Sequence, residues 1–197
     1  MGKIVLLMGK STTGKDTVYR NLLEKNKFDL KKVVLYTTRP MRDKEENGVQ
    51  YFFCDEEGYQ KFLNDRKIIE GRTYDTCYGP WRYFTVDDGQ IDLESSSSLM
   101  IGTLEAYESM TNYFGKDKVV PVYIEISDRI RMERAMHREN KQEHPKYDEM
   151  CRRYLADEED FSEEKLKAAG ITRRFNNEGT IDQILDEINE YLTQMGV

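Results

Sequence analysis

A glycine-rich segment near the start of the chain has the residue types and spacing of a phosphate-binding loop. Gly9 and Gly14 are separated by four residues, and Lys15 follows the second glycine. This spacing lets the loop backbone turn its N–H groups toward phosphate oxygens while the lysine ammonium reaches the outer phosphates. The apolar run 4–8 and the helical pattern 18–26 flank the segment, as such a site requires. An accidental match in a turn rich in glycine and threonine is the less favoured interpretation.

The position after the loop lysine raises the question of a metal ion. Asp16 stands where a hydroxyl residue is usual, and Thr17 offers a hydroxyl one residue later. A carboxylate there could bind Mg²⁺ directly, through a water molecule, or not at all. Asp16 and Thr17 are therefore the candidate metal ligands.

A second candidate anion site follows the next predicted strand. The run 32–36 is typical of a strand, and Pro40 keeps the following residues from forming a helix. Arg39 and Arg42 thus lie beyond the carboxyl end of a strand, where ligands bind in α/β sheets. Ordinary solvated charges are the alternative, but the position close behind a phosphate loop favours anion binding.

A basic helical hairpin is predicted in the second half of the chain. A helix from Asp128 carries Arg131, Arg134 and Arg138, and a second helix over 147–167 carries Arg152 and Arg153. The polar stretch 139–146, with a proline, separates them, so the pattern indicates an αα-hairpin with a mobile tip that acts as a lid. A solvated hairpin whose arginines pair with the acidic residues 157–160 is the alternative.

The remaining pattern alternates strands and helices. Asp55 is expected to cap a helix at 56–64 and Thr180 a C-terminal helix whose apolar stripe is core. Four serines make 87–98 a loop. The other predicted elements are strands at 51–54, 67–74, 78–86, 99–102, 119–126 and 171–176 and a helix at 104–113.

Composition limits the class of protein. The chain has 197 residues, which suits one α/β domain, and its net charge of -7 argues against a general nucleic-acid binder. Local arginine clusters suit a phosphorylated small molecule instead. Three widely spaced cysteines indicate free thiols in a reducing compartment, and no signal or membrane segment is recognised. We therefore expect a soluble, cytoplasmic protein, monomeric or homodimeric, that binds neither nucleic acid nor membrane.

These motifs together resemble the guanylate kinase family, nucleoside monophosphate kinases of the P-loop class, over nearly the whole chain. The resemblance implies an α/β P-loop NTPase three-layer fold with a central parallel sheet, a small β-rich acceptor-binding lobe and a helical lid. The core would comprise residues 1–34, 99–130 and 168–197, the lobe about 35–98 and the lid about 131–167. In the phosphate loop, Lys10 replaces a usual proline and Thr12 a usual third glycine.

The acceptor signature is the more specific part of the resemblance. The segment 37–42 is similar to the family's Thr-Thr-Arg-x-Pro-Arg, with the proline displaced by one place, which implies that Arg39 and Arg42 hold the acceptor phosphate. Tyr51 and Tyr78 match two tyrosines that touch the same phosphate, and Glu70 matches the guanine-reading glutamate. The alternative for Glu70 is a surface residue at a strand end. The sequence departs from the family at Leu35, Pro80, Ile101 and Thr103, where other guanine-site residues are usual.

The resemblance also assigns roles for the donor side. Arg134, Arg138 and Arg153 match the lid arginines, and Asn176 matches an asparagine near the adenine pocket. ATP-binding residues would be Gly9, Lys10, Ser11, Thr12, Thr13, Gly14, Lys15, Asp16, Thr17 and Asn176. Catalytic residues would be Lys15, Arg39, Arg134, Arg138 and Arg153, and acceptor-binding residues Arg39, Arg42, Tyr51, Glu70, Tyr78 and Thr103.

The expected activity is ATP-dependent phosphoryl transfer, with Mg²⁺ as cofactor, to a nucleoside monophosphate, above all GMP or dGMP. Two alternatives stay open. One is a kinase of the same fold that acts on another phosphorylated acceptor, such as ribose bisphosphate. The other is a non-catalytic guanylate-kinase-like domain that binds phosphorylated peptides.

Overall fold

Parallel strands form the larger of two sheets in the computed structural model, which describes residues 1–76 and 79–197. The strand β1 (Ile4–Met8) lies at its centre and pairs in parallel with β7 and with β8. All of its residues are buried, as expected for a strand covered on both faces. The strand order is β2 (Lys31–Lys32), β7 (Ser98–Ile101), β1, β8 (Val119–Glu125) and β9 (Arg174–Asn176).

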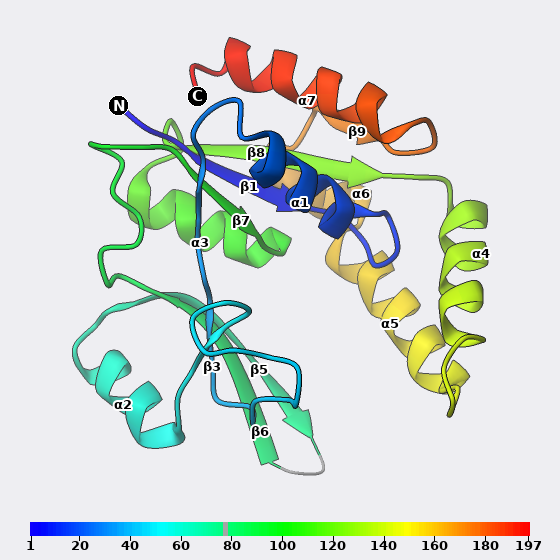
Figure 1. Ribbon diagram of the computed structural model, residues 1–197, viewed down its shortest axis with the longest axis horizontal. Helices are drawn as coiled ribbons and strands as arrows, with labels where there is room; N and C mark the ends of the chain where they lie inside the picture. The colour runs from blue at the N-terminus through cyan, green and yellow to red at the C-terminus, as the bar shows by residue number, and fades with distance from the viewer. Residues whose placement is uncertain (77–78) are drawn as a thin grey trace.

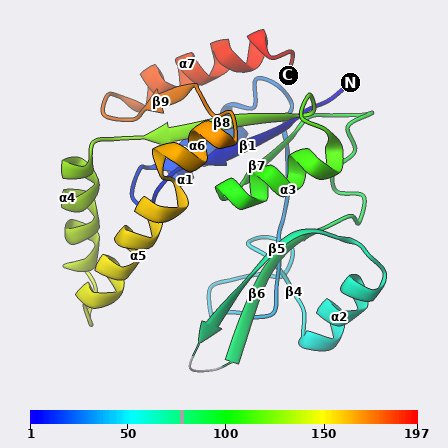
Figure 2. The ribbon, with the colours of Figure 1, turned by 180° about the vertical axis from the view of Figure 1, so that it is seen from behind.

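Two helical layers cover this sheet, and the alternating side chains of β1 show how. Val5 and Leu7 pack in one apolar cluster with α1 (Lys15–Lys25) and α7 (Ile181–Gln194). Leu6, on the opposite face, packs in a second cluster with α3 (Leu104–Phe114) and α6 (Glu163–Ala168). Figure 1 shows α1 in front of the sheet, and Figure 2 brings α3 and α6 forward. The expected three-layer α/β fold with a central parallel sheet is confirmed.

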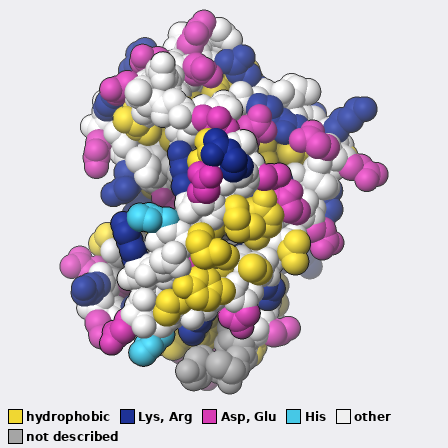
Figure 3. Space-filling model, turned by 90° about the vertical axis from the view of Figure 1, so that its right-hand side faces the viewer, with side chains coloured by type: hydrophobic (Ala, Val, Ile, Leu, Met, Phe, Trp, Pro, Cys, Tyr) yellow, Lys and Arg dark blue, Asp and Glu magenta, His cyan; other side chains and the backbone are white. Residues whose placement is uncertain are grey.

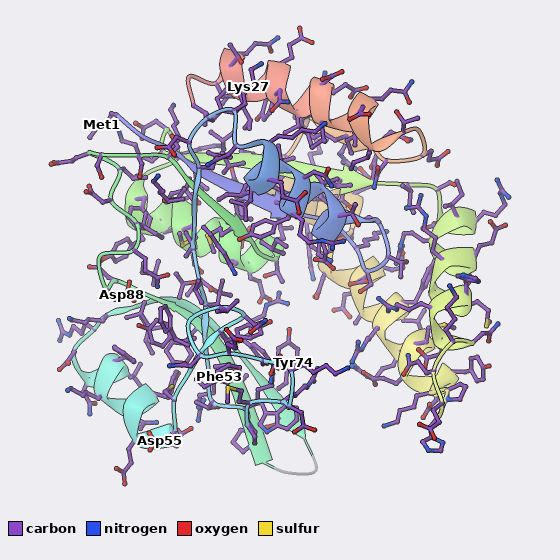
Figure 4. The ribbon with its side chains drawn as sticks, viewed as in Figure 1. Met1, Lys27, Phe53, Asp55, Tyr74 and Asp88 are labelled. Carbon is purple, nitrogen blue, oxygen red and sulfur yellow. The ribbon has the colours of Figure 1, made fainter. Side chains whose placement is uncertain are left out.

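A smaller sheet forms the lobe at the bottom of Figure 1. Its order is β4 (Phe52–Phe53), β3 (Tyr36–Thr37), β6 (Gly79–Val86) and β5 (Ile68–Thr76), with β5 and β6 antiparallel. The helix α2 (Glu56–Asn64) packs beside it through aromatic contacts such as Phe62 with Phe84, whose ring centroids are 6.2 Å apart. Asp55, labelled in Figure 4, accepts a hydrogen bond from Gly58 N at 2.8 Å, so the predicted cap of α2 is confirmed.

A helical hairpin projects beside the larger sheet and is called the lid hairpin below. It consists of α4 (Asp128–Glu139) and α5 (Tyr147–Asp160). Figure 3 faces this side of the molecule and shows hydrophobic side chains bordered by charged ones; exposed apolar residues of the hairpin are Met136, Tyr147 and Leu155. Within residues 1–76 and 79–197, no helix combines the length and the apolar character needed to cross a bilayer.

The prediction of one strand at 32–36 is wrong. Lys31 and Lys32 pair with β7 in the larger sheet, whereas Tyr36 and Thr37 pair with β4 and β6 in the smaller one. Between these two short strands, the backbone N–H and C=O of Val34 form hydrogen bonds with the side-chain amide of Gln90 rather than with another strand. The apolar run is continuous because the chain is buried as it crosses between sheets.

The prediction of one helix at 147–167 is also wrong. Phe161 turns into the core and contacts the ring of Tyr123, with centroids 5.6 Å apart, and Ser162 then caps a new helix, α6. Burial of one aromatic side chain thus interrupts a pattern that is helical on both sides. The last strand, predicted at 171–176, pairs with β8 only over Arg174–Asn176.

Candidate active site

The phosphate loop connects the carboxyl end of β1 to the first turn of α1. Gly14 lies immediately before α1 with φ 87°, a left-handed conformation that glycine adopts without strain. A β-carbon built on Gly14 would lie 2.5 Å from Asn177 Nδ2. Lys15, Asp16 and Thr17 follow in the first turn of α1, where a helix has N–H groups without intrahelical partners and the positive end of its dipole. This end of α1 can bind an anion.

Thr12 occupies a conformation that usually calls for glycine. Its φ is 66°, and a left-handed conformation costs a non-glycine residue on the order of 1–3 kcal/mol. The Thr12 hydroxyl contacts Ser11 O at 2.6 Å and Arg131 O at 3.0 Å as a hydrogen-bond donor, and Thr13 Oγ1 donates to Lys10 O at 2.9 Å. Hydroxyl groups therefore brace a loop that lacks a third glycine.

Asn177, which the sequence analysis missed, joins the loop to the end of β9. Its buried amide donates from Nδ2 to Thr13 O at 2.7 Å. The predicted Asn176 is exposed, and its Oδ1 accepts from Glu178 N at 2.8 Å. Asn176 pairs with Glu125 in the sheet, and the side chain that reaches the loop is that of the next residue, Asn177. Two adjacent asparagines were the only signal in the sequence.

The three predicted lid arginines lie in different surroundings. Arg134 Nη2 donates to Asn177 O at 3.3 Å, and its Nη1 would lie 3.7 Å from a β-carbon on Gly14. Arg138 is exposed one turn farther along α4, and Arg153 is exposed on α5, where its Nε donates to Glu149 Oε1 at 2.8 Å. The structure therefore brings Arg134 to the loop and leaves the other two on the surface of the lid hairpin.

Arg131 is the lid-hairpin arginine that reaches the loop most closely, and it was not among the predicted site residues. It is 1% exposed and pairs with Glu158, which also accepts a hydrogen bond from Lys10. Burial opposes the charged form of Glu158, but the hydrogen bonds from Lys10 and Arg131 outweigh it and lower the pKa of Glu158. Pairing with the acidic end of α5, the alternative considered for the hairpin, thus occurs at Arg131, in a buried setting.

The predicted acceptor-phosphate seat contains a carboxylate that the sequence analysis missed. Arg39 is 4% exposed, and its Nη1 donates to Glu45 Oε2 at 2.7 Å. Its guanidinium lies over the ring of Tyr51, 5.1 Å from the centroid. Arg42 is exposed, and its backbone N donates to Glu45 at 2.9 Å. The hydrogen bonds from Arg39 and then from Arg42 lower the pKa of Glu45 to about 2. Tyr78 lies outside the described residues.

Glu70 lies on β5 in a largely buried position rather than on the surface. Its Oε1 accepts from Thr85 Oγ1 at 2.6 Å. Burial raises the pKa of Glu70, while the Thr85 hydrogen bond and the nearby charge of Arg72 partly offset this. Arg72 connects the lobe to the core through an ion pair with Glu105 of α3, 2.7 Å apart. Glu70 thus sits beside the contact between the smaller sheet and α3.

The four positions at which the sequence departs from the family resemblance lie in different parts of the structure. Thr103 caps α3 and accepts from Ala106 N at 3.2 Å. Leu35 and Ile101 are half buried against the two apolar clusters of the core. Pro80 lies exposed in β6. Leu35, Ile101 and Pro80 have no polar side-chain group to offer a base.

This arrangement defines a class of protein. A glycine-rich loop between β1 and α1 of a parallel sheet, with a helical hairpin beside the loop and a β-rich lobe below it, defines an α/β protein of the P-loop fold. Residues 1–86 match the family model described as guanylate kinase. This match covers less than half of the chain, and the similar proteins found by sequence and by structure are also guanylate kinases.

Curated relatives match parts of the chain. The guanylate kinase of Anaplasma phagocytophilum is 33% identical over 125 residues, 63% of this chain and 58% of that protein. The guanylate kinase of Mycoplasma mobile is 38% identical over 79 residues, 40% of this chain and 39% of that protein. The chain thus spans less than two thirds of the length of the curated relatives it matches.

The likeness in structure extends further than the likeness in sequence. The crystal structure of guanylate kinase from Anaplasma phagocytophilum superposes with a TM-score of 0.64 and covers 98% of this chain and 85% of its own. The sequence identity is 18%, so this comparison shows a common fold. The family match ends at residue 86, before Ile101, Thr103 and the lid hairpin.

Proposed function

We propose that the chain transfers the γ-phosphoryl group of ATP to a nucleoside monophosphate and that GMP or dGMP is the favoured acceptor. One observation carries this proposal. The residues that match the guanylate kinase family, 1–86, hold both the phosphate loop and the acceptor candidates Arg39, Tyr51 and Glu70. The candidate donor site and the candidate acceptor site of one reaction thus both lie within the matched residues.

The donor side would position the triphosphate and stabilise its charge. Lys15 and the N-terminal N–H groups of α1 would face the phosphates, and Arg134 lies near Gly14 of the same loop. A phosphate oxygen of the acceptor forms a bond to the γ-phosphorus as the bond to the ADP oxygen breaks. Such a transition state is loose and spreads charge over the peripheral oxygens, so fixed cations are the main catalytic groups.

The acceptor side would hold the monophosphate at the smaller sheet. Arg39, with Arg42, Tyr51 and Tyr78, binds the phosphate, and the Glu70 carboxylate accepts hydrogen bonds from the N–H edge of guanine. Arg39 is buried and already oriented by Glu45 and by the Tyr51 ring. An arginine held in this way loses little side-chain entropy when the phosphate arrives. Thr103 would contact the acceptor from the start of α3.

Magnesium is the cofactor we propose, carried with ATP. Asp16 and Thr17 are exposed in the first turn of α1, directly after Lys15. Their carboxylate and hydroxyl oxygens fit an ion that is usually held by one or two protein oxygens together with substrate phosphates. When bound, Mg²⁺ neutralises charge on the phosphate oxygens.

Movement of the lid hairpin would complete the site. Arg138 and Arg153 are exposed on it, so they serve the transferred group only if the hairpin closes over the bound nucleotides. Closure would also exclude water and prevent hydrolysis of ATP.

A second acceptor class is favoured by the positions at which the sequence departs from the family resemblance. Leu35 and Ile101 pack against the apolar core, and Pro80 has no side-chain donor, so fewer groups than usual are available to recognise guanine. A kinase of the same fold acting on another phosphorylated acceptor, such as ribose bisphosphate, would not need them.

We further propose a cytoplasmic monomer or homodimer whose ligands are nucleotides rather than nucleic acid. The net charge of -7 and the free thiols Cys54 and Cys151 support this proposal.

A panel of acceptors tests the proposed function. ADP formation from ATP and Mg²⁺ is measured with GMP, dGMP, AMP, UMP, dTMP and ribose bisphosphate, with Lys15→Met as the inactive control. Activity on GMP or dGMP, reduced by at least about a hundredfold in the control, supports the proposal. Activity on ribose bisphosphate alone supports the second candidate. No activity on any acceptor, together with phosphopeptide binding, would identify a binding domain.

A further inference from the structure

Two carboxylates of α5 are bound to groups of the phosphate loop. Asp157 Oδ2 accepts a hydrogen bond from Ser11 N at 2.7 Å. Glu158 Oε2 accepts one from Lys10 Nζ. A loop amide and a loop lysine are the groups that such a loop offers to phosphate. The lid hairpin therefore supplies anions at the place where a donor phosphate would bind.

Arg131 lies against the same position with part of its hydrogen-bonding capacity unused. Its Nη1 donates to Asp128 at 3.0 Å and to Glu158, and its guanidinium stacks on the ring of Tyr154, 4.2 Å from the centroid. Its Nη2 is buried and has no hydrogen-bond partner among the described residues. Asp157 Oδ2 is 3.6 Å from Nη2, an ion-pair distance but too long for a hydrogen bond.

A buried donor without an acceptor costs free energy, and a charged one costs more. The surrounding contacts hold the guanidinium in place, so Nη2 cannot simply turn to solvent. One oxygen, Asp157 Oδ2, is therefore approached by two donors, Ser11 N and Arg131 Nη2, and satisfies only the first. A phosphate group has three oxygens and more negative charge, so it could satisfy both donors at once.

We propose that Arg131 binds a phosphate of the donor nucleotide and that the Asp157 carboxylate occupies the position of this phosphate until the nucleotide binds. A phosphate oxygen of the bound triphosphate replaces Asp157 Oδ2 between the Ser11 amide and Arg131 Nη2. Asp157 and the phosphate are both anions and cannot share the amide, so nucleotide binding releases this end of α5 from the loop. This inference rests on the proposed function, because it requires that the loop bind a nucleotide triphosphate.

Calorimetric titration of the full chain with MgATP, in the absence of acceptor, tests the proposal. Asp157→Asn removes the competing charge with little change in size, and Glu159→Gln neutralises an exposed carboxylate next to it on α5 as the matched control. We expect Asp157→Asn to bind ATP on the order of three- to tenfold more tightly than wild type, and Glu159→Gln to match wild type. Tripolyphosphate, used as a second probe, should show the same gain, because the exchange concerns phosphate alone.

A second variant tests the arginine itself. Arg131→Lys keeps the positive charge, but one ammonium group cannot occupy the positions of both Nη1 and Nη2. We expect this variant to bind ATP about tenfold more weakly than wild type. Circular dichroism shows whether the variant is folded. If this variant does not fold, the Asp157→Asn comparison decides alone. The proposed replacement of Asp157 Oδ2 by a phosphate oxygen is overturned if Asp157→Asn binds ATP no more tightly than wild type. It is also overturned if Asp157→Asn binds ATP more tightly but does not bind tripolyphosphate more tightly. Absence of ATP binding by wild type overturns the proposed function, and this inference with it.

Discussion

Under the proposed function, the buried carboxylate of Glu70 would recognise the acceptor. Burial raises its pKa, whereas the N–H edge of guanine would bind the ionised form of the carboxylate. We therefore predict that the KM for GMP rises as the pH falls from neutrality through this raised pKa. Glu70→Gln should show a KM at least about tenfold higher, because a charge-assisted hydrogen bond is lost, and that KM should not change with pH. Steady-state kinetics at several pH values provide the measurement, and a pH-dependent KM in Glu70→Gln would refute the assignment.

Glu45 makes a separate prediction about acid stability. Its pKa is about 2 in the folded chain, against an ordinary value of 4.5, chiefly because of the hydrogen bonds from Arg39. A lowered folded-state pKa adds stability that is fully present above the ordinary value and is lost as the pH falls through the lowered one. The stability difference between wild type and Glu45→Gln should therefore shrink as the pH falls from 4.5 to about 2. Urea unfolding across this range measures it, and a constant difference contradicts the prediction.

Individual site residues could be predicted from the sequence where a local motif marks them, but the residues that contact them in the folded chain could not. Arg39 and Glu70 stand out from their motifs, but the seat of Arg39 includes Glu45, six residues farther along a loop whose turn cannot be read from residue types. At β9 the sequence could not say which of two asparagines faces the loop, because that depends on where pairing with β8 ends.

The strand–loop–helix unit of β1 and α1 depends on Gly14. Glycine substitutions can separate the effect of its left-handed conformation from that of its close contact with Asn177. Gly14 and Gly89 have similar positive φ angles, 87° and 89°, but only at Gly14 would a β-carbon meet another residue, Asn177. Gly89→Ala should lower the free energy of unfolding by about 1 kcal/mol from the left-handed conformation alone. Gly14→Ala should cost more and weaken ATP binding, since the clash displaces the loop. Chemical unfolding and ATP titration provide the comparison; equal effects of the two substitutions would argue against a close loop–Asn177 contact.

Helices and strands were predictable where one periodicity holds along a segment. The caps at Asp55 and Thr180 are confirmed, the latter as a complete capping box with Gln183. The failures at 32–36 and 147–167 have one cause, because in each case a buried segment changes partner without a change in composition. Long-range packing decided both places, and local propensity could not reveal it.

The three parts of the molecule contact one another through charged residues that no motif indicates. Arg72 of β5 pairs with Glu105 of α3 and lies 3.7 Å from Asp160 at the end of α5. The phosphate loop contacts the lid hairpin through Asp157, Glu158 and Arg131. The alternation of strands and helices was enough to predict the fold class, whereas these contacts join residues far apart in the chain. A ligand that bound between such parts would change how they pack if it favoured one arrangement over another.

Under the proposed function, one chain binds ATP and a nucleoside monophosphate and passes a phosphoryl group between them. Phosphorus-31 NMR of the protein with ATP, Mg²⁺ and GMP follows every phosphate in the reaction at once. We predict that the ATP signals decline while ADP and GDP signals appear in equal amounts, with little inorganic phosphate. ATP left unchanged, or converted to ADP and inorganic phosphate with GMP intact, would contradict this account.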